Sequence, residues 1–319
     1  MIDSKKKVSV IMPAYNGARY IREAIESVLE QSYRNIELII VEDASTDDTY
    51  EVIQRFNDSR IICLRNNTNR GISFSTNRGI RESSGYYIAL LDDDDIAEQN
   101  RIELQVEYME NNTSIDVLGG KTIFVDTDGE VLWYGGTPRN NPKYIRAMTL
   151  FRSVDFMNST IMIRRSFWDE SGIEYRENCL GMQDYMFFVE AAKKGNLSSI
   201  DKYLVKHRQH GNNATDIIRS TDGGNRIRKW KDIQRMSLCM AGFSLSDEQF
   251  QKIGDAFVEN SDGLDSIGEL LEIIKIFRLI ISQGNKVNID YLPEIKDFCR
   301  KSAVHFFSGI DFLEDSNIL

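Results

Sequence analysis

The chain has 319 residues, of which 41% are hydrophobic and 28% are charged, and its net charge is −10. That length and apolar content suffice for one large domain or two ordinary ones, and they exclude a disordered or low-complexity protein. The acidic balance argues against a general nucleic-acid binder.

The sequence predicts a soluble, cytoplasmic protein. Residues 5–7 are lysines, but a predicted strand follows them directly and not an apolar segment of signal-peptide length. Nowhere do 18 apolar residues run together, so we expect no transmembrane helix. The four cysteines are widely spaced and form no CxxC pair, which argues against a disulfide framework and against a zinc knuckle.

The first 95 residues alternate between short apolar runs and amphipathic helical patterns. The apolar runs predict strands at residues 8–12, 36–41, 60–64 and 86–91. The helical patterns cover residues 18–31 and 73–83, and a helix start is expected at 45–48. This rhythm is typical of βαβ units around a parallel sheet.

Beyond residue 95 the pattern is looser. We expect helices at 101–111 and 184–194, and a helix start near Glu98. Strands are expected at 115–125, 130–134, 158–164 and 199–206. A hairpin turn is expected at 126–129 and a polar loop from residue 135. From about residue 225 the chain reads as helical and acidic. In its most apolar segment, Leu270–Ile281, the charged residues step by three, which predicts a helix buried on most sides. The apolar character of this segment has two alternative explanations: packing in a core, or a contact with another subunit or a membrane surface.

Charge is distributed unevenly along the chain. It amounts to −5 for residues 1–100, −5 for 101–138, +7 for 139–235 and −7 for 236–319. The basic stretch includes Arg139, Lys143, Arg146, Arg152, Arg164, Arg165, Lys202, Lys206 and Arg208. It predicts either separate solvated faces or one surface that meets an anionic partner, such as a phosphorylated substrate or an acidic bilayer.

Four consecutive carboxylates, Asp92–Asp95, follow the predicted strand at 86–91. The carboxyl ends of parallel strands open onto the ligand crevice of such a sheet. Like charges packed there raise one another's pKa unless a cation is present, and carboxylate oxygens suit a hard divalent ion. The alternative is a solvated acidic turn that caps the next helix.

Three smaller clusters also carry polar chemistry. Asp43 ends the second strand and is either a ligand acceptor or part of a helix-entry turn. Asp184 precedes a helix, where an isolated Asp is usually a cap. His207 and His210 lack further His or Cys neighbours, which argues against zinc. No Walker loop, GxSxG or GxGxxG follows a strand.

Taken together, these motifs resemble the opening of family 2 inverting glycosyltransferases. The similarity lies in residues 8–17, 27–32, 41–49, 69–79 and 91–96, with Gln183–Tyr185 and Arg208–His210 matching downstream signatures. It covers about residues 6–215. The resemblance implies a GT-A fold, a mostly parallel α/β sheet flanked by helices, with an α-helical C-terminal extension.

The resemblance also implies roles for individual residues on the donor side. Pro13, Ala14 and Tyr15 would hold the base, and Asp43 would accept the N3–H of uracil. Arg70 lies in the matching 69–73 motif and is assigned to the donor site. Among the carboxylates, Asp93 would face the ribose.

Metal and catalytic roles follow in the same way. Mn²⁺ or Mg²⁺ is expected, with Asp94 as the direct ligand and Asp92 and His210 beside it; Asp92 would also contact the donor. Arg208 would lie near the diphosphate. Asp184 would be the catalytic base. Two departures from the family pattern are Glu42 for Asp before Asp43, and Gln183 for Glu before Asp184, which removes one negative charge beside the base.

The expected activity is transfer of a sugar from a nucleotide-diphospho-sugar, a UDP-sugar above all, to a hydroxyl of a saccharide acceptor. A carboxylate takes the hydroxyl proton and a cation stabilises the leaving diphosphate. A retaining double displacement would want a second carboxylate near the first, and no separate candidate exists. The open alternatives are a sugar nucleotidyltransferase and a catalytically silent module that binds a glycan or a partner.

The predicted organisation is a catalytic domain at 1–224, with a donor-binding half at about 1–97 and an acceptor-binding half at about 98–224, and a helical extension at 225–319. We expect a lipid-linked acceptor of cell-surface polysaccharide synthesis, which fits a peripheral location at the inner face of the plasma membrane. A homo-oligomer is also an expectation.

Overall fold

The computed structural model describes residues 6–179, 181–211, 213–258, 264 and 266–309. The expectations for residues 1–5, for 259–263 and for the last ten residues lie outside this range. The chain forms two compact units, one made of residues 1–142 and 155–220, the other of residues 143–154 and 221–319. The second unit thus includes a segment from the middle of the chain, a feature absent from the division expected at residue 224. That division stays a prediction.

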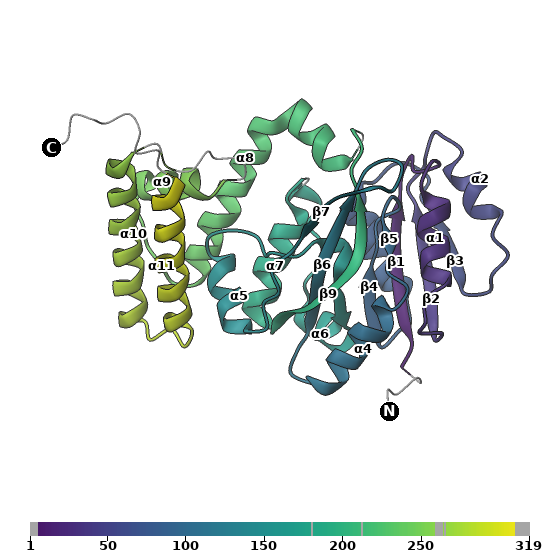
Figure 1. The fold of residues 1–319 in the computed structure, drawn as a ribbon, viewed down its shortest axis with the longest axis horizontal. Coiled ribbons are helices and arrows are strands. Elements are labelled where there is room, and N and C mark those ends of the chain that lie inside the picture. Colours follow the sequence, from purple (N-terminus) through teal and green to yellow (C-terminus); the bar gives the residue numbers. More distant parts are fainter. Residues whose placement is uncertain (1–5, 180, 212, 259–263, 265, 310–319) are drawn as a thin grey trace. The chain divides into compact units, whose positions relative to one another are not determined.

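The first unit is built on one mixed sheet (Figure 1) with the strand order β3-β2-β1-β4-β8-β6-β9-β5. Four neighbouring strands are parallel: β1 (Val8–Ala14), β2 (Ile36–Glu42), β3 (Ile61–Arg65) and β4 (Tyr87–Leu90). The short β8 (Met162–Arg164) runs antiparallel to both β4 and β6 (Val117–Val125). Strand β6 then pairs in parallel with β9 (Leu197–Arg208). The remaining strands, β5 (Ile96–Ala97) and β7 (Val131–Gly135), run antiparallel to β9 and β6 respectively.

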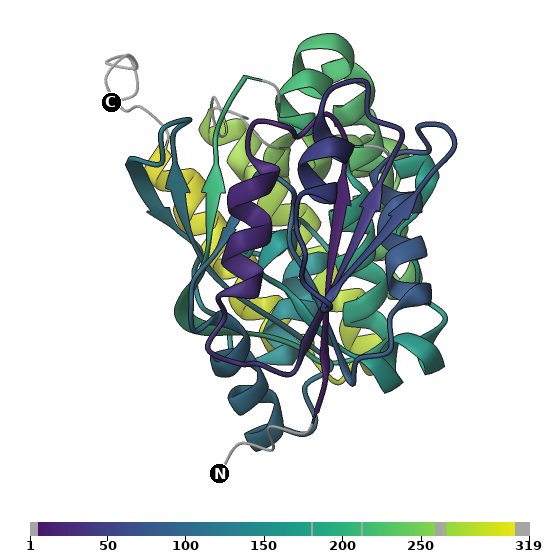
Figure 2. The ribbon, with the colours of Figure 1, turned by 90° about the vertical axis from the view of Figure 1, so that its right-hand side faces the viewer.

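Helices cover both faces of the parallel half. Helices α1 (Ile21–Leu29) and α4 (Arg101–Asn111) pack on the face that carries Val10 and Met12. On the opposite face, α3 (Ile72–Glu82) approaches so closely that a Cβ on Gly79 would lie 2.6 Å from the side chain of Ile11. Only glycine fits at that point of contact. Figure 2 shows α1, in purple, alongside the strands.

The strands and helices expected in the first 95 residues are confirmed, apart from shifts of a few residues at their ends. One such shift is at α2 (Thr49–Gln54), which begins after Asp48, a residue whose side chain makes no capping bond. The loops after β1 and β2 each contain a non-glycine residue in the left-handed region, Asn16 (φ 53°) and Ala44 (φ 57°). Such a conformation costs a residue with a Cβ about 1 kcal/mol or more, so the surrounding contacts must hold both loops in place.

Two expectations for the middle of the chain are wrong in part. The predicted strand at 158–164 is a 3₁₀ turn, η1 (Asn158–Thr160), followed by the three residues of β8. The residues near Glu98 follow the short strand β5, and α4 begins only at Arg101. The loop expected from residue 135 is confirmed, because residues 136–141 form neither helix nor strand before α5 (Pro142–Thr149) begins.

Further elements complete the first unit. Helix α6 (Arg165–Ser171), which the sequence pattern did not predict, follows β8, and the turn η2 (Glu177–Cys179) precedes α7 (Gln183–Lys194). The expected hairpin turn at 126–129 is confirmed, with Asp126 and Gly129 closing it between β6 and β7.

The second unit is helical in its described residues, as expected. Its helices are the body of α5, the second part of α8 (Ala214–Met240, kinked at Asp222), α9 (Asp247–Phe257), α10 (Ile267–Lys286) and α11 (Leu292–Gly309). Four phenylalanine rings meet at its centre: Phe151 stacks on Phe298 at 5.1 Å and contacts Phe257 and Phe277. Within the described part of the chain, no helix is long and apolar enough to cross a bilayer.

Helix α10 is buried on one face and not on most sides, so that prediction is wrong. Leu270, Ile273 and Phe277 lie in the core of the unit, whereas Leu271 is 53% exposed. The apolar pattern misled because the charged residues, spaced by three, do not mark one polar stripe, although neighbouring helices cover only one side.

Leu270 and Leu271 form a matched pair for measuring this burial. We expect Leu270→Ala to lower the free energy of unfolding by about 2–5 kcal/mol, because it leaves a cavity in a packed core. Leu271→Ala should cost about 0.5 kcal/mol or less, as surface substitutions do. Urea denaturation of the whole chain measures both. Equal losses would show that α10 is covered on both sides.

Candidate active site

The acidic run Asp92–Asp95 lies where β4 ends, and the last residues of β9 meet it. Nδ1 of His207 lies 2.9 Å from Oδ1 of Asp95, and the same oxygen accepts the backbone N–H of Arg208 at 3.1 Å. Nε2 of His210 lies 2.9 Å from Oδ2 of Asp94. Two segments more than 110 residues apart are therefore joined at one point.

A buried arginine lies next to this run. Arg101, at the start of α4, has no exposed surface and donates from Nη2 to the carbonyl of Leu90 at 2.7 Å. Burial lowers the pKa of Arg101 to about 9, although Asp95 and Asp92 act in the opposite direction. Nη1 of Arg101 and Oδ2 of Asp95 are buried and have no hydrogen-bond partner among the described residues. The guanidinium thus supplies positive charge to the carboxylates without a direct bond.

The structure disfavours the ionised forms of Asp92 and Asp93. Burial raises the pKa of Asp92, and Asp95 and Asp94 raise it further. Burial and the neighbours Asp94 and Asp92 likewise hold the pKa of Asp93 well above its usual value. Both shifts mean that the ionised run lacks a sufficient counter-charge, which a cation at this place would provide.

The loop after β1 comes directly against Asp93. The backbone N–H of Tyr15 donates to Oδ2 of Asp93 at 3.1 Å, and a Cβ on Gly17 would lie only 2.2 Å from that oxygen. Pro13 and Ala14 are the last residues of β1, whereas the Tyr15 side chain is 46% exposed. Of the three residues expected to hold the base, Tyr15 thus has an open ring next to the acidic run.

Asp43 lies at the end of β2 and is 2% exposed. Its Oδ1 accepts from Nδ2 of Asn66 at 2.6 Å and from the backbone N–H of Arg70 at 2.9 Å, while Oδ2 accepts from the N–H of Gly71 at 2.7 Å. The structure thus gives Asp43 a supporting role that the sequence did not suggest. The Arg70 guanidinium lies 4.0 Å over the ring of Phe74.

Asp184 lies in the first turn of α7, and its charge acts on Asp92 and on Tyr175. Tyr175 is buried, and its hydroxyl donates to Oδ1 of Asn158 at 2.7 Å. Asn77 of α3 fixes this segment by bonding both the N–H and the carbonyl of Tyr175. Asp184 therefore belongs to the same electrostatic neighbourhood as the end of β4.

Arg208 makes internal bonds that the sequence did not predict. It is 2% exposed, and its guanidinium donates to Glu23, to the carbonyls of Asp126 and Thr127, and to the carbonyl of Asp94. It also lies 4.8 Å over the ring of Tyr20. The structure shows Arg208 as a tie between α1, the β6–β7 turn and the acidic run. A contact with a diphosphate stays a prediction.

Two arginines of the basic stretch serve inside the fold. The Arg164 side chain is buried and donates to the carbonyls of Ile115 and Met109. The Arg165 guanidinium donates to the carbonyls of Gly85 and Ile80. A count of charges along the sequence does not reveal that these side chains satisfy backbone groups inside the fold.

Sequence reasoning missed three residues of the site. Asn213 donates from Nδ2 to Oδ2 of Asp94 at 3.2 Å and accepts the N–H of His210 at Oδ1. Arg101 and Tyr175 are the other two. The only signal for Asn213 was its position three residues after His210, a spacing typical of a local side-chain cap; Arg101 and Tyr175 carried none.

The donor set fits a divalent cation in one respect. Nε2 of His210 and Oδ2 of Asp94, both ligand-type atoms, face each other at 2.9 Å beside two carboxylates that lack counter-charge. Among the described residues, no group of three or more His, Cys, Asp or Glu side chains is arranged to hold a metal. Asp92 thus does not join Asp94 and His210 in the arrangement seen here.

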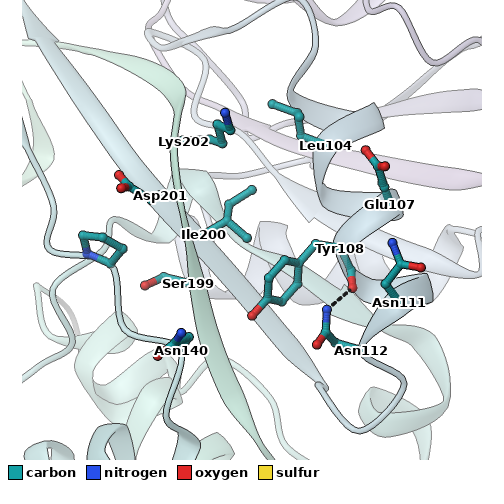
Figure 3. Close-up of a pocket in the computed structure, with 11 residues that line it drawn as sticks. Leu104, Glu107, Tyr108, Asn111, Asn112, Asn140, Ser199, Ile200, Asp201 and Lys202 are labelled. Carbon is teal, nitrogen blue, oxygen red and sulfur yellow. Dashed lines mark hydrogen bonds between the residues drawn. The ribbon is translucent and has the colours of Figure 1, made fainter.

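A separate pocket of about 600 Å³ lies between α4 and β9 (Figure 3). Tyr108 is at its centre, with Asn111 and Asn112 on one side and Asp201 and Lys202 on the other. It contains none of the predicted site residues.

Comparison with known proteins identifies the family. The model of "Glycosyl transferase family 2" matches residues 9–172, about half of the chain. The chain belongs to glycosyltransferase family 2. It is 33% identical over 220 residues to an uncharacterised glycosyltransferase of Haemophilus influenzae, covering 66% of this chain and 68% of that protein.

Two further relatives carry more specific names. WfaP of Escherichia coli, a UDP-Glc:α-D-GlcNAc-diphosphoundecaprenol β-1,3-glucosyltransferase, is 30% identical over 204 residues, covering 63% of this chain and 77% of WfaP. Residues 1–349 of S. aureus TarS, solved with UDP-GlcNAc, match with a TM-score of 0.62 at 15% identity, covering 96% of this chain and 93% of TarS 1–349. This likeness confirms the GT-A fold. This family 2 glycosyltransferase is therefore an enzyme, and neither alternative class applies.

The three bonds to Asp43 lead to a prediction about the glycosyltransferase without ligand. Asp43→Asn keeps the shape but replaces one accepting oxygen by an N–H₂ group, which leaves at least one buried donor unpaired. We expect the free energy of unfolding to fall by about 1–3 kcal/mol, measured by urea denaturation. Asp48→Asn, at an exposed cap without a side-chain bond, is the control and should change little. An unchanged Asp43→Asn variant would show that Asp43 does not hold the 70–71 loop.

Proposed function

We propose that this glycosyltransferase moves a sugar from a UDP-sugar to a hydroxyl of a lipid-linked saccharide, with inversion at the anomeric carbon. The observation that carries the proposal is the common electrostatic site of Asp92, at the end of β4, and Asp184, at the start of α7. One carboxylate group belongs to the donor side of the fold and the other to the acceptor side. The ligands named for WfaP and TarS support the choice of donor and acceptor class.

On the donor side, we assign the uracil to the loops that follow β1 and β2. The open Tyr15 ring offers a stacking surface, and Asp43 has an accepting site left after its three internal bonds, since a carboxylate accepts about four. Asp93, fixed by the N–H of Tyr15, lies where the ribose would follow. Arg70 would close the loop next to the base.

We further propose that Asp94 and His210 hold a Mn²⁺ or Mg²⁺ ion, with Asp92 beside them. Such an ion, when bound, neutralises charge on the leaving diphosphate. In its absence His210 and Asn213 hold the Asp94 carboxylate in one orientation, so the ligand oxygens are preorganised. His207 and Arg101 offset part of the remaining negative charge.

Asp184 would act on the acceptor. A sugar hydroxyl needs a base to take its proton as the bond to the anomeric carbon forms. Its position in the first turn of α7 supports this role, because a helix N-terminus stabilises negative charge. Because the proposal assigns Asp92 to the donor and the metal and Asp184 alone to the acceptor, Asp184 acts as a single base, which leads to direct displacement and hence inversion.

Asp184→Asn tests the proposed function. The amide keeps the shape but cannot take a proton, so kcat should fall by about 10²–10⁴. The dissociation constant for UDP should change little, because the base faces the acceptor. The turnover number is measured as UDP release from UDP-glucose and UDP-N-acetylglucosamine, with a synthetic N-acetylglucosamine-diphospholipid as acceptor. Calorimetry measures the dissociation constant for UDP. Asp169→Asn, an exposed carboxylate on α6, is the control.

The product linkage decides the stereochemistry independently. From an α-linked donor, NMR should show a β-linked product. An α-linked product, or full turnover by Asp184→Asn, would contradict the assignment of Asp184 as base.

Asp94→Ala tests the metal proposal. Titration of UDP by calorimetry should show tighter binding with Mn²⁺ than with EDTA in the parent protein, and this difference should disappear in Asp94→Ala because the ion loses its main ligand. Asp128→Ala removes an exposed carboxylate from the β6–β7 turn and should keep the Mn²⁺ effect. Equal UDP affinity with Mn²⁺ and with EDTA in the parent would rule out the metal-dependent donor site.

A further inference from the structure

The strand β7, which pairs with β6 at the edge of the sheet, exposes large apolar side chains. Val131, Leu132, Trp133 and Tyr134 are each 46–61% exposed. A cluster of exposed apolar side chains on an edge strand often marks a binding surface. The two aromatic residues point to opposite faces, because side chains alternate along a strand.

Trp133 belongs to a row of rings that ends at the active site. Its ring stacks on Phe124 of β6 with centroids 4.8 Å apart and an angle of 17°. Phe124 meets His207 of β9 edge to face at 5.5 Å, and His207 bonds Asp95 at 2.9 Å. These three residues are register partners across β7, β6 and β9. The row therefore connects an open indole directly to the acidic run.

The Phe124 ring in this row is held in place by the backbone of β7. A Cβ on Gly135 would lie 2.5 Å from the Phe124 ring, so this ring rests on bare backbone and cannot shift toward it. Trp133 stacks on Phe124 and is still 46% exposed, so it has surface left for a ligand. A rigid aromatic face binds a ligand at a low cost in conformational entropy.

The charge around the hairpin restricts what can bind there. The turn next to Trp133 carries Asp126, Asp128 and Glu130, and the last two are exposed. These carboxylates repel a diphosphate or an acidic bilayer. A neutral sugar ring, by contrast, has a face of C–H groups that suits the negative face of an indole, and hydroxyls that the carboxylates can accept from.

We propose that Trp133 is a stacking platform for a neutral sugar ring of the saccharide acceptor. The proposal rests on the proposed function, in that it takes the acidic run for the place of transfer, and it adds the side from which the acceptor approaches. The platform lies on the face of the β6–β7 hairpin that leads to His207. The opposite face, where Tyr134 packs against Tyr203 at 5.1 Å, leads away from that row and serves as a built-in comparison.

Saturation-transfer NMR with chitobiose and cellobiose tests the platform without turnover. The parent protein, with UDP and Mn²⁺, should saturate the ring C–H protons of at least one disaccharide. Trp133→Ala should weaken that binding by about three- to tenfold, the effect of losing one aromatic stacking partner. Trp133→Phe should retain most of the affinity, and Tyr134→Ala, of similar exposure, should match the parent.

Other outcomes overturn the proposal. It fails if the parent binds neither disaccharide at tens of millimolar, if Trp133→Ala binds as the parent does, or if Tyr134→Ala loses as much. A Trp133→Ala variant that changes the oligomeric state in place of sugar binding would assign the strand to contacts between copies, which also overturns it.

UDP binding, measured by calorimetry on the same samples, separates the two proposals. If UDP binds and Asp184→Asn loses turnover while Trp133→Ala leaves sugar binding unchanged, the proposed function stands and the platform falls. If UDP does not bind but the disaccharide binds through Trp133, the donor assignment falls and the platform stands.

Discussion

The structure depends on one electrostatic constraint: four carboxylates follow one another at the end of a buried strand. Charges so close together are stable only if positive groups or hydrogen-bond donors reach them. The protein supplies these from two places. Arg101, six residues after Asp95 in the sequence, is buried and acts on the run by its charge. Strand β9 brings His207 and the backbone N–H of Arg208 to Asp95, and His210, just beyond it, meets Asp94. Strand β9 pairs with β6 over most of its length, and this pairing carries its last residues to the acidic run.

The same constraint links the two parts of the sheet in the first unit, the parallel strands β3-β2-β1-β4 and the strands β8, β6 and β9 that follow them. The parallel half alone would end at β4 with uncompensated charge. Strand β8 joins β4 to β6, and β6 joins β9, so that the sheet carries the histidines back to the acidic run. Arg208 then ties the run to α1 through Glu23. A site assembled across a continuous sheet is held more rigidly than one formed by loops alone.

The sequence predicted the strongly periodic elements well and the short ones poorly. Helix α4 has the predicted bounds, because its apolar spacing and its start are both clear. Strand β8, with three residues, is too short to show a period, and its position is set by two neighbouring strands. Among the site residues, Asp94 and His210 were predicted together from motifs and are adjacent. Arg101 and Tyr175 could not be predicted, because their roles come from burial against distant segments, which no local pattern records.

Asp43 shows why fold and specificity cannot be assigned to separate residues. Its carboxylate accepts three internal donors and so holds the loop that carries Arg70 and Gly71. The next residue, Ala44, is held in the left-handed region, a conformation that persists only where surrounding contacts impose it. One accepting site is left over, and its direction is set by the three bonds already made. A ligand donor that meets this site finds an acceptor that needs no reorganisation, which is how a buried polar network gains selectivity. Any change at Asp43 therefore disturbs the 70–71 loop, and under the proposed function it disturbs the donor site as well, because the same three bonds orient the remaining accepting site.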